Sequence, residues 1–428
     1  MNNFLSYIIM GDSSDIERIF QKDFTLPKYK TKRWIVVPDS NKGNYTAPLS
    51  YECREHKDKL VAYHNGYVRI KGYIQSTTGT DLANNDEVAF KNGHYSIIEN
   101  CNVNLEGQEI DQSMYIYLTM TVLNLFEYSN DYAISIAESY GFAKDNKNVV
   151  DDNDGHDKRK LLLGKYVAAT KRYPFTLKIP TSHLSTFFRR LDFPLINHTV
   201  KIELSVADRL VNCLLRGNAV QASKVTIETT ELILPVVVLP SEYEVKFMNK
   251  LASKSFPMTL DWDQLKVYPV ANTVSGEVNS EVASAVYGLN RLYVLAIHED
   301  NWGKQTHVET FINTTLSNVN VVIDGEQFYH QNINDDEMAY ELVKECFNNG
   351  GIDNDKGTCL TYINWITCYK IYAFDLSRQK VLEDDPRKAQ SLRFRCTLPA
   401  GNYKIIYIVS CNKQTKIDFC NTYNLKNI

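Results

Sequence analysis

An acidic segment at residues 151–157, with the sequence DDNDGHD, has the residue types that bind a calcium ion through carboxylate oxygens. An EF-hand loop needs an acidic residue five positions before its glycine and a glutamate six positions after it. Val150 and Leu161 stand at those two positions around Gly155. The spacing therefore fails, and we expect no metal ion in this segment.

The other chemically reactive residue types also lack the spacing of a catalytic or cofactor site. The nine histidines contain no H-x-x-x-H or H-E-x-x-H pair of the kind that holds zinc on a helix. The chain has no G-x-x-x-x-G-K-[ST] phosphate loop, no G-x-S-x-G nucleophile elbow and no G-x-G-x-x-G dinucleotide motif. The sequence therefore predicts no catalytic, cofactor-binding or metal-binding residue. We expect that the protein is not an enzyme and has no small-molecule substrate.

Length and composition indicate two β-rich domains. A chain of 428 residues exceeds the size at which one hydrophobic core usually stops growing. Its 27 Tyr and 18 Phe accompany many Val, Ile and Thr residues, which favour pleated strands over helices. The formal net charge of -4 gives no global attraction to nucleic acid or membrane, so any such contact must be local.

Cysteine usage indicates a protein made in the cytosol with reduced thiols. The nine cysteines are odd in number and form no C-x-x-C pair, and the chain lacks the basic start of an export signal. They stand at positions 53, 101, 213, 346, 359, 368, 396, 411 and 420.

We interpret residues 1–50 as an N-terminal arm. Ser14 followed by Glu17 has the pattern of a capping box, which predicts a short helix over residues 12–21. Residues 28–34, KYKTKRW, form a basic and aromatic cluster that could touch nucleic acid or acidic lipid headgroups. A solvated positive surface is the simpler interpretation of this cluster.

From about residue 60, short runs of alternating apolar residues predict strands, and helical stretches between them are few. Gly72 within one run predicts a β-bulge. The predicted strands cover residues 60–64, 67–74, 175–179, 200–205, 225–229 and 232–239 in the first half, and 292–297, 318–323, 371–374, 392–398 and 403–409 in the second.

The sequence contains an internal duplication, which predicts two domains of similar structure. Residues 102–107, NVNLEG, match residues 320–325, NVVIDG, at an offset of 218. Each copy is an alternating strand that ends in an acidic residue and a glycine, Gly107 or Gly325, which suits a tight hairpin turn with positive φ.

A helix is expected after each hairpin, and a second sequence match follows. The helical stretch at about residues 113–126 is apolar, and the one at about residues 335–347 is amphipathic. Further on, residues 175–180, FTLKIP, match residues 394–399, FRCTLP, at an offset of 219. We expect Pro180 and Pro399 to stand at equivalent structural turns.

The sequence thus predicts an all-β chain of two tandem jelly-roll β-sandwiches with short inserted helices. The first is expected at residues 51–245 and the second at residues 246–428, with the seam near residues 240–256. Polar segments at residues 145–160 and 348–356 are expected to project from the sandwiches as loops.

This organisation resembles the double jelly-roll major capsid proteins of icosahedral DNA viruses, above all the smaller Polinton-like and virophage-like members. The resemblance covers about residues 60–410. The stretches that carry it are residues 187–204, with FPLIN at 193–197, residues 289–294 (LNRLYV), 319–328 and 374–379 (FDLSRQ).

The resemblance implies a major capsid protein that forms homotrimers, whose six jelly rolls make pseudo-hexameric capsomers in an icosahedral shell. Its implied partners are neighbouring capsomers, minor capsid or penton proteins, and an internal membrane or the genome through the N-terminal arm. The implied location is the virion, after synthesis in the host cytoplasm.

Two other classes of function remain open from the sequence. A peptide-N-glycosidase-like hydrolase with two jelly rolls would need a cleft with convergent carboxylates where the modules meet. A carbohydrate-binding β-sandwich protein would need exposed aromatic platforms and disulfides, which four Trp and an odd cysteine count do not favour.

Overall fold

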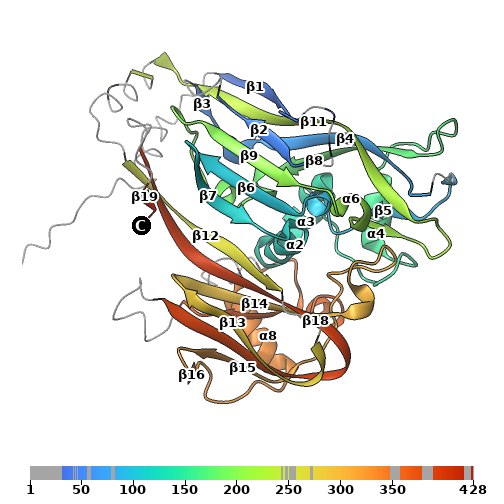
Figure 1. Ribbon diagram of the computed structural model, residues 1–428, viewed down its shortest axis with the longest axis vertical. Helices are drawn as coiled ribbons and strands as arrows, with labels where there is room; N and C mark the ends of the chain where they lie inside the picture. Colours follow the sequence, from blue (N-terminus) through green and yellow to red (C-terminus); the bar gives the residue numbers. More distant parts are fainter. Residues whose placement is uncertain are drawn as a thin grey trace, which may run out of the picture.

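The computed structural model shows two β-rich modules, the first coloured blue to green and the second yellow to red (Figure 1). The predicted helix at residues 12–21 and loop at residues 348–356 lie outside the described residues. The structure describes residues 31–41, 43, 45, 47–54, 59–78, 82–241, 244–245, 249, 257–269, 273–347, 357–377, 389–418 and 426–427.

The first module contains two antiparallel sheets with the orders β1-β11-β4-β8 and β2-β9-β6-β7. A short strand β3 extends the first sheet beside β11, and β5 and β10 form a separate pair. The strands are β1 (Thr31–Pro38), β2 (Leu49–Glu52), β3 (Leu60–Val61), β4 (Tyr67–Ser76), β5 (Val88–Phe90), β6 (Asn100–Leu105), β7 (Gln108–Ser113), β8 (Tyr173–Pro180), β9 (Val200–Ser205), β10 (Leu214–Arg216) and β11 (Ser223–Val238).

The two sheets face each other because their apolar residues alternate with polar ones. Val68 and Ile70 of β4, and Val103 and Leu105 of β6, are buried in one continuous core. The neighbours between them point away from that core, which is why the sequence shows a period of two.

The second module has the same strand order, although one long strand serves both of its sheets. Residues 390–403 of β18 pair with β13, and residues 392–397 within them also pair with β15. Residues 406–418 pair with β12, and residues 403–411 pair with β14. The strands are β12 (Pro257–Pro269), β13 (Thr273–Val286), β14 (Leu289–His298), β15 (Ser317–Ile323), β16 (Glu326–Gln327), β17 (Tyr372–Asp375), β18 (Gln390–Asp418) and β19 (Lys426–Asn427).

The two modules are therefore the same eight-stranded jelly roll. The orders β12-β18-β14-β17 and β13-β18-β15-β16 repeat β1-β11-β4-β8 and β2-β9-β6-β7 when the two parts of β18 replace β11 and β9. Equivalent strands also follow one another in the same sequence order. The predicted fold class, two tandem jelly rolls with short helices, is confirmed.

The first sequence match joins equivalent strands, but the second does not. Residues 102–107 form the first strand and the turn of the hairpin β6-β7. Residues 320–325 do the same in the hairpin β15-β16. Phe175 lies in β8, whose counterpart is β17, whereas Phe394 lies in the part of β18 that replaces β9. The prediction that Pro180 and Pro399 are equivalent is wrong: Pro180 ends β8, and Pro399 lies where β18 passes from one sheet to the other.

Unequal loop lengths explain this error. Val103 pairs with Ile202, 99 residues later, whereas the equivalent pair Val321 and Phe394 is 73 residues apart. A constant offset therefore cannot hold beyond the hairpin, and the second match arises from two unrelated strands that share an alternating pattern and a proline.

Residues 31–38 correct the predicted limit of the N-terminal arm. They form β1, which pairs with β11 along its whole length from Thr31↔Val238 to Pro38↔Glu231. The arm assigned to residues 1–50 therefore overlaps the first jelly roll. The basic residues Lys32 and Arg33 of the predicted cluster lie on this edge strand, beside the half-exposed Trp34.

The short helices lie in the connections between strands, as predicted. The hairpin β6-β7 precedes α2 (Ile116–Glu127), and the equivalent β15-β16 precedes α8 (Asp336–Glu345). The other α-helices in the described ranges are α3 (Asn130–Ile134), α4 (Asp154–Leu161), α5 (Thr186–Arg190), α6 (Arg209–Asn212) and α9 (Tyr362–Thr367). None of the described helices has the length and apolarity to cross a bilayer.

The segment at residues 145–160 is packed, so the prediction of a projecting loop is wrong. Its second part forms α4, and Asp145, Asn153 and Arg159 are all buried. The Arg159 guanidinium donates hydrogen bonds to the carbonyl oxygens of Phe90 (2.6 Å) and Ala143 (2.7 Å) and to Oδ1 of Asp145 (2.6 Å). These bonds allow a polar segment to be buried.

The acidic-glycine pairs form the two hairpin turns with left-handed backbone. Glu106 and Gly107 have φ values of 50° and 80°, and Asp324 and Gly325 have values of 50° and 89°. Two consecutive positive φ values are typical of the turn that matches the twist of a β-hairpin. At Gly72 the register shift lies on the partner strand β11, opposite the glycine, which approaches Thr226 too closely for a Cβ atom.

Replacing Gly325 tests this turn. We expect Gly325→Val to lower the free energy of unfolding by about 1–2 kcal/mol, because a β-branched residue resists positive φ. The space around the position is open, so no steric clash contributes. Chemical denaturation checks the value, and Gly325→Asn, which tolerates this conformation, is the control. Equal stability of wild type and the valine variant would contradict the turn assignment.

Two buried histidines in the first module predict that the protein loses stability in mild acid. Burial lowers the pKa of His94 to about 4 and that of His183 to about 3, both below the ordinary 6.5. Below pH 6.5 the unfolded chain therefore binds protons that the folded chain does not. As the pH falls from 6.5 to 5, each histidine should lower the free energy of unfolding by about 1.4 kcal/mol per pH unit. Above pH 6.5 neither histidine should lower it.

Denaturation midpoints at pH 7.5, 6 and 5 measure this effect. His183→Gln should remove one histidine's share of the pH slope, whatever its effect on stability at pH 7.5. A slope that is the same in the variant and in wild type would show that His183 titrates normally in the folded protein.

Candidate functional site: the interface between the modules

The interface between the two jelly rolls is the candidate functional site, because buried charged side chains from both modules meet there. Helix α2 lies between the sheets of the first module and strands β14 and β18 of the second (Figure 1). Phe126 of α2 contacts Tyr293 of β14 edge to face, with ring centroids 5.1 Å apart, and Phe347 at 5.4 Å. A second aromatic contact joins Phe187 of α5 to Trp262 of β12 at 5.4 Å.

The sequence of α2 suits this position. From Ile116 to Phe126 every residue of the helix is buried, including the polar Thr119 and Asn124. A helix covered on all sides needs apolar residues around its whole circumference. Helix α8, the equivalent insertion in the second module, buries only Ala339 and Val343 and has an amphipathic sequence.

A polar part of the interface is built around Glu309, which the loop between β14 and β15 carries into the first module. Its carboxylate lies 3.7 Å from the Lys91 ammonium and 3.5 Å from the Arg209 guanidinium. The three side chains are at most 3% exposed. Glu309 belongs to the second module and both cations to the first, so the buried charges bridge the two jelly rolls.

Each cation of this cluster has further partners in the first module or at the interface. The Arg209 guanidinium stacks 3.6 Å from the ring centroid of Tyr117, and its Nε donates to the Ser96 carbonyl at 3.1 Å. Lys91 Nζ donates to the Lys304 carbonyl at 2.8 Å. Burial lowers the pKa of Lys91, and the Glu309 carboxylate opposes that shift.

Gln305, in the same loop, makes a second polar contact across the interface. Its side-chain Oε1 accepts hydrogen bonds from Arg216 Nε and from the Ser223 amide, both at 3.0 Å. Its Nε2 donates to the Val211 carbonyl at 2.7 Å. The backbone adds a bond from Arg216 N to the Gln305 carbonyl at 2.7 Å, so the amide side chain is enclosed by the first module.

Carboxylates at the module junction are already paired, and a cavity there is small. The cavity has a volume of about 10 Å³, close to the minimum for one water molecule. Of the two acids that line it, Glu127 accepts from Arg189 Nε at 2.6 Å and Asp263 accepts from Asn290 Nδ2 at 2.8 Å. The two carboxylates around this cavity are therefore engaged by neighbouring side chains and do not converge on open space.

The residues singled out from the sequence do not converge on this interface. Gly107 and Gly325 occupy hairpin turns in different modules, and Pro180 and Pro399 lie at a strand end and a strand bend. The eight cysteines within the described residues are free and buried, so they offer no disulfide there. Sequence reasoning missed Lys91, Arg209 and Glu309, because nothing in their local sequence shows that they meet.

Comparisons with known proteins agree with this architecture. No protein-family model and no curated protein sequence matches the chain. Solved structures do match it over nearly its whole length. A chain of the Sputnik virophage structure has a TM-score of 0.65 at 11% identity, covering 95% of this chain and 90% of that chain.

Two further matches are viral capsid structures. A chain of the PBCV-1 virus capsid has a TM-score of 0.54 at 9% identity, covering 94% of this chain and 98% of that chain. The Faustovirus major capsid protein has a TM-score of 0.50 at 9% identity, covering 95% and 94%. The chain therefore has the double jelly-roll fold of these capsid proteins, as its sequence resemblance predicts.

Neutralising Glu309 tests the buried charge cluster. Glu309→Gln leaves Lys91 and Arg209 buried without their shared counter-charge, so we expect a loss of about 3–5 kcal/mol in the free energy of unfolding. The control is Glu341→Gln, which removes an exposed pair with Lys344 and should change stability by less than about 0.5 kcal/mol. Denaturation of both variants measures the difference, and similar small losses would show that the cluster does not hold the modules.

Proposed function

We propose that the chain is a major capsid protein, which forms homotrimers with six jelly rolls in a pseudo-hexameric capsomer. The observation that carries the proposal is the repeat of one eight-stranded jelly roll in a single chain, with a fold that matches the PBCV-1 capsid chain over 98% of the latter's length. Three copies of a two-module chain supply six similar sandwiches around a threefold axis, and closed cyclic symmetry uses one type of contact throughout.

The rigid interface between the modules supports a role as a building block. Shell assembly requires each subunit to present its lateral surfaces at fixed angles. The buried Glu309 cluster and the enclosed Gln305 join the two sandwiches through directional contacts, which favour one relative orientation over a sliding apolar contact.

Exposed apolar side chains provide contact area for association. Leu161 is 84% exposed, Ile363 is 65% exposed and Tyr287 is 60% exposed. An assembly that covers these side chains would remove their apolar surface from water, which favours association.

The proposed partners are further copies of the chain, minor capsid or penton proteins, and an internal membrane or the genome through the segment before β1. The proposed location is the virion, after synthesis in the host cytoplasm. Lys28 and Lys30 lie in that segment, and Lys32 and Arg33 follow at the start of β1. These four basic residues support a contact with acidic headgroups or phosphates.

The mass of the purified chain in solution tests the proposal. Light scattering coupled to size exclusion should give three times the 49.1 kDa mass of one chain, and negative-stain images of concentrated protein should show hexagonal particles or arrays. Glu309→Gln should reduce the trimer fraction, whereas Glu341→Gln should not. A monomer that persists at high concentration and releases glycans from glycopeptides would contradict the proposal and favour the hydrolase.

A further inference from the structure

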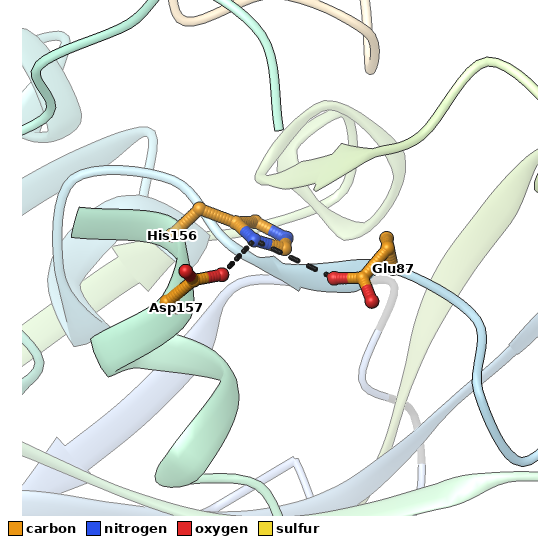
Figure 2. A group of neighbouring side chains, drawn as sticks. All are labelled: Glu87, His156 and Asp157. Carbon is orange, nitrogen blue, oxygen red and sulfur yellow. Dashed lines mark ion pairs between the residues drawn. The ribbon is translucent and has the colours of Figure 1, made fainter. Parts of the chain in front are cut away.

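Three side chains that are far apart in the sequence meet on the first module (Figure 2). Glu87 immediately precedes β5, and His156 and Asp157 lie in the first turns of α4. The His156 Nδ1 atom lies 3.6 Å from Asp157 Oδ1 and 4.0 Å from Glu87 Oε2. The three ligand atoms lie within 4.8 Å of one another.

The histidine at the centre of this cluster is buried and has no hydrogen-bond partner in the described structure. The side chain of His156 is 0% exposed, and neither Nδ1 nor Nε2 makes a hydrogen bond with a described residue. Leaving a polar ring nitrogen buried without a partner costs about 1–3 kcal/mol. Nδ1 is aimed at both carboxylates but stands too far from either for a hydrogen bond, so the space between the three atoms suits an additional group (Figure 2).

The separations fit a metal ion. An ion equidistant from three atoms with these separations would lie about 2.0–2.5 Å from each of them. Zinc binds imidazole nitrogen at about 2.0–2.1 Å and carboxylate oxygen at about 2.0–2.2 Å, so small side-chain rotations complete the coordination.

The surrounding charges leave the ligand atoms available. Lys160 pairs with the other oxygen of Glu87, Oε1, at 2.6 Å, which orients the carboxylate with Oε2 toward His156.

We propose that Glu87, His156 and Asp157 bind a divalent transition-metal ion, with zinc as the best fit. One imidazole nitrogen and two carboxylate oxygens form a donor set suited to zinc, whereas calcium and magnesium prefer oxygen ligands alone. The exposed carboxylates, 66% for Asp157 and 47% for Glu87, leave room for water to complete the coordination. This site does not depend on the proposed capsid function.

A bound ion would fasten α4 to the segment before β5, close to the interface between the modules. The Glu87 carbonyl accepts a hydrogen bond from Gly217 N at 2.9 Å, and the adjacent Arg216 contacts Gln305 of the second module. The ion would therefore stabilise the surface onto which the loop with Gln305 and Glu309 docks.

Zinc titration of the chelator-treated full chain tests the site. We expect one zinc ion per chain, measured by competition with a chromophoric chelator, and a rise in Tm when zinc is added. Asp157→Asn and Glu87→Gln should each weaken zinc binding at least tenfold and remove most of the Tm rise. The matched control is Asp152→Asn, a carboxylate in the same segment that is 91% exposed and lies outside the cluster.

The variants also define the results that would overturn the site. Either no stoichiometric zinc binding by wild type, or the same affinity in wild type, Asp157→Asn and Glu87→Gln, would show that these residues hold no metal. Both substitutions replace exposed or half-exposed side chains with amides of the same shape, so loss of folding does not complicate the comparison.

Discussion

One buried carboxylate, that of Glu309, holds the arrangement of the two modules. It belongs to the second jelly roll but is shared by two cations of the first, Lys91 and Arg209, in a place that water does not reach. Charges in such a place tolerate little displacement, because any movement that separates them leaves one of them desolvated and unpaired. The aromatic contacts of Phe126 and Phe187 add area to the interface, while the charges restrict its geometry.

The two copies of the jelly roll have kept their strand order and diverged in what lies between the strands. The segment from Val103 to Ile202 is longer than its counterpart from Val321 to Phe394. It contains α2, which packs against the second module, and α4, which packs against β5 of its own module. Sheet pairing constrains the strands, because each residue has a fixed partner on its neighbour. Connections meet no such constraint, so they can acquire separate roles, such as the enclosed α2 and the half-exposed α8.

Helix α4 shows how polar residues come to be buried in this fold. Asn153 caps the helix by accepting hydrogen bonds from the amides of Gly155 and His156, and Arg159 is satisfied by two carbonyls and Asp145. The bonds of Asn153 and Arg159 offset the cost of removing polar groups from water. His156 lacks such partners within the described residues, which sets it apart from its neighbours on the same helix.

The sequence by itself determined the fold class, about half of the strands, the hairpin repeat ending in Gly107 and Gly325, and the different character of the helices that became α2 and α8. The strands that it did not predict include β1, β2, β12 and β13. The predicted features are local, because alternation, turn residues and amphipathic patterns depend on neighbours within a few positions. Only the tertiary structure decided which strands are equivalent, since loop length is not encoded in strand pattern. It alone brought Glu309 to Lys91 and Arg209, and Glu87 to His156, because such meetings depend on how distant segments pack.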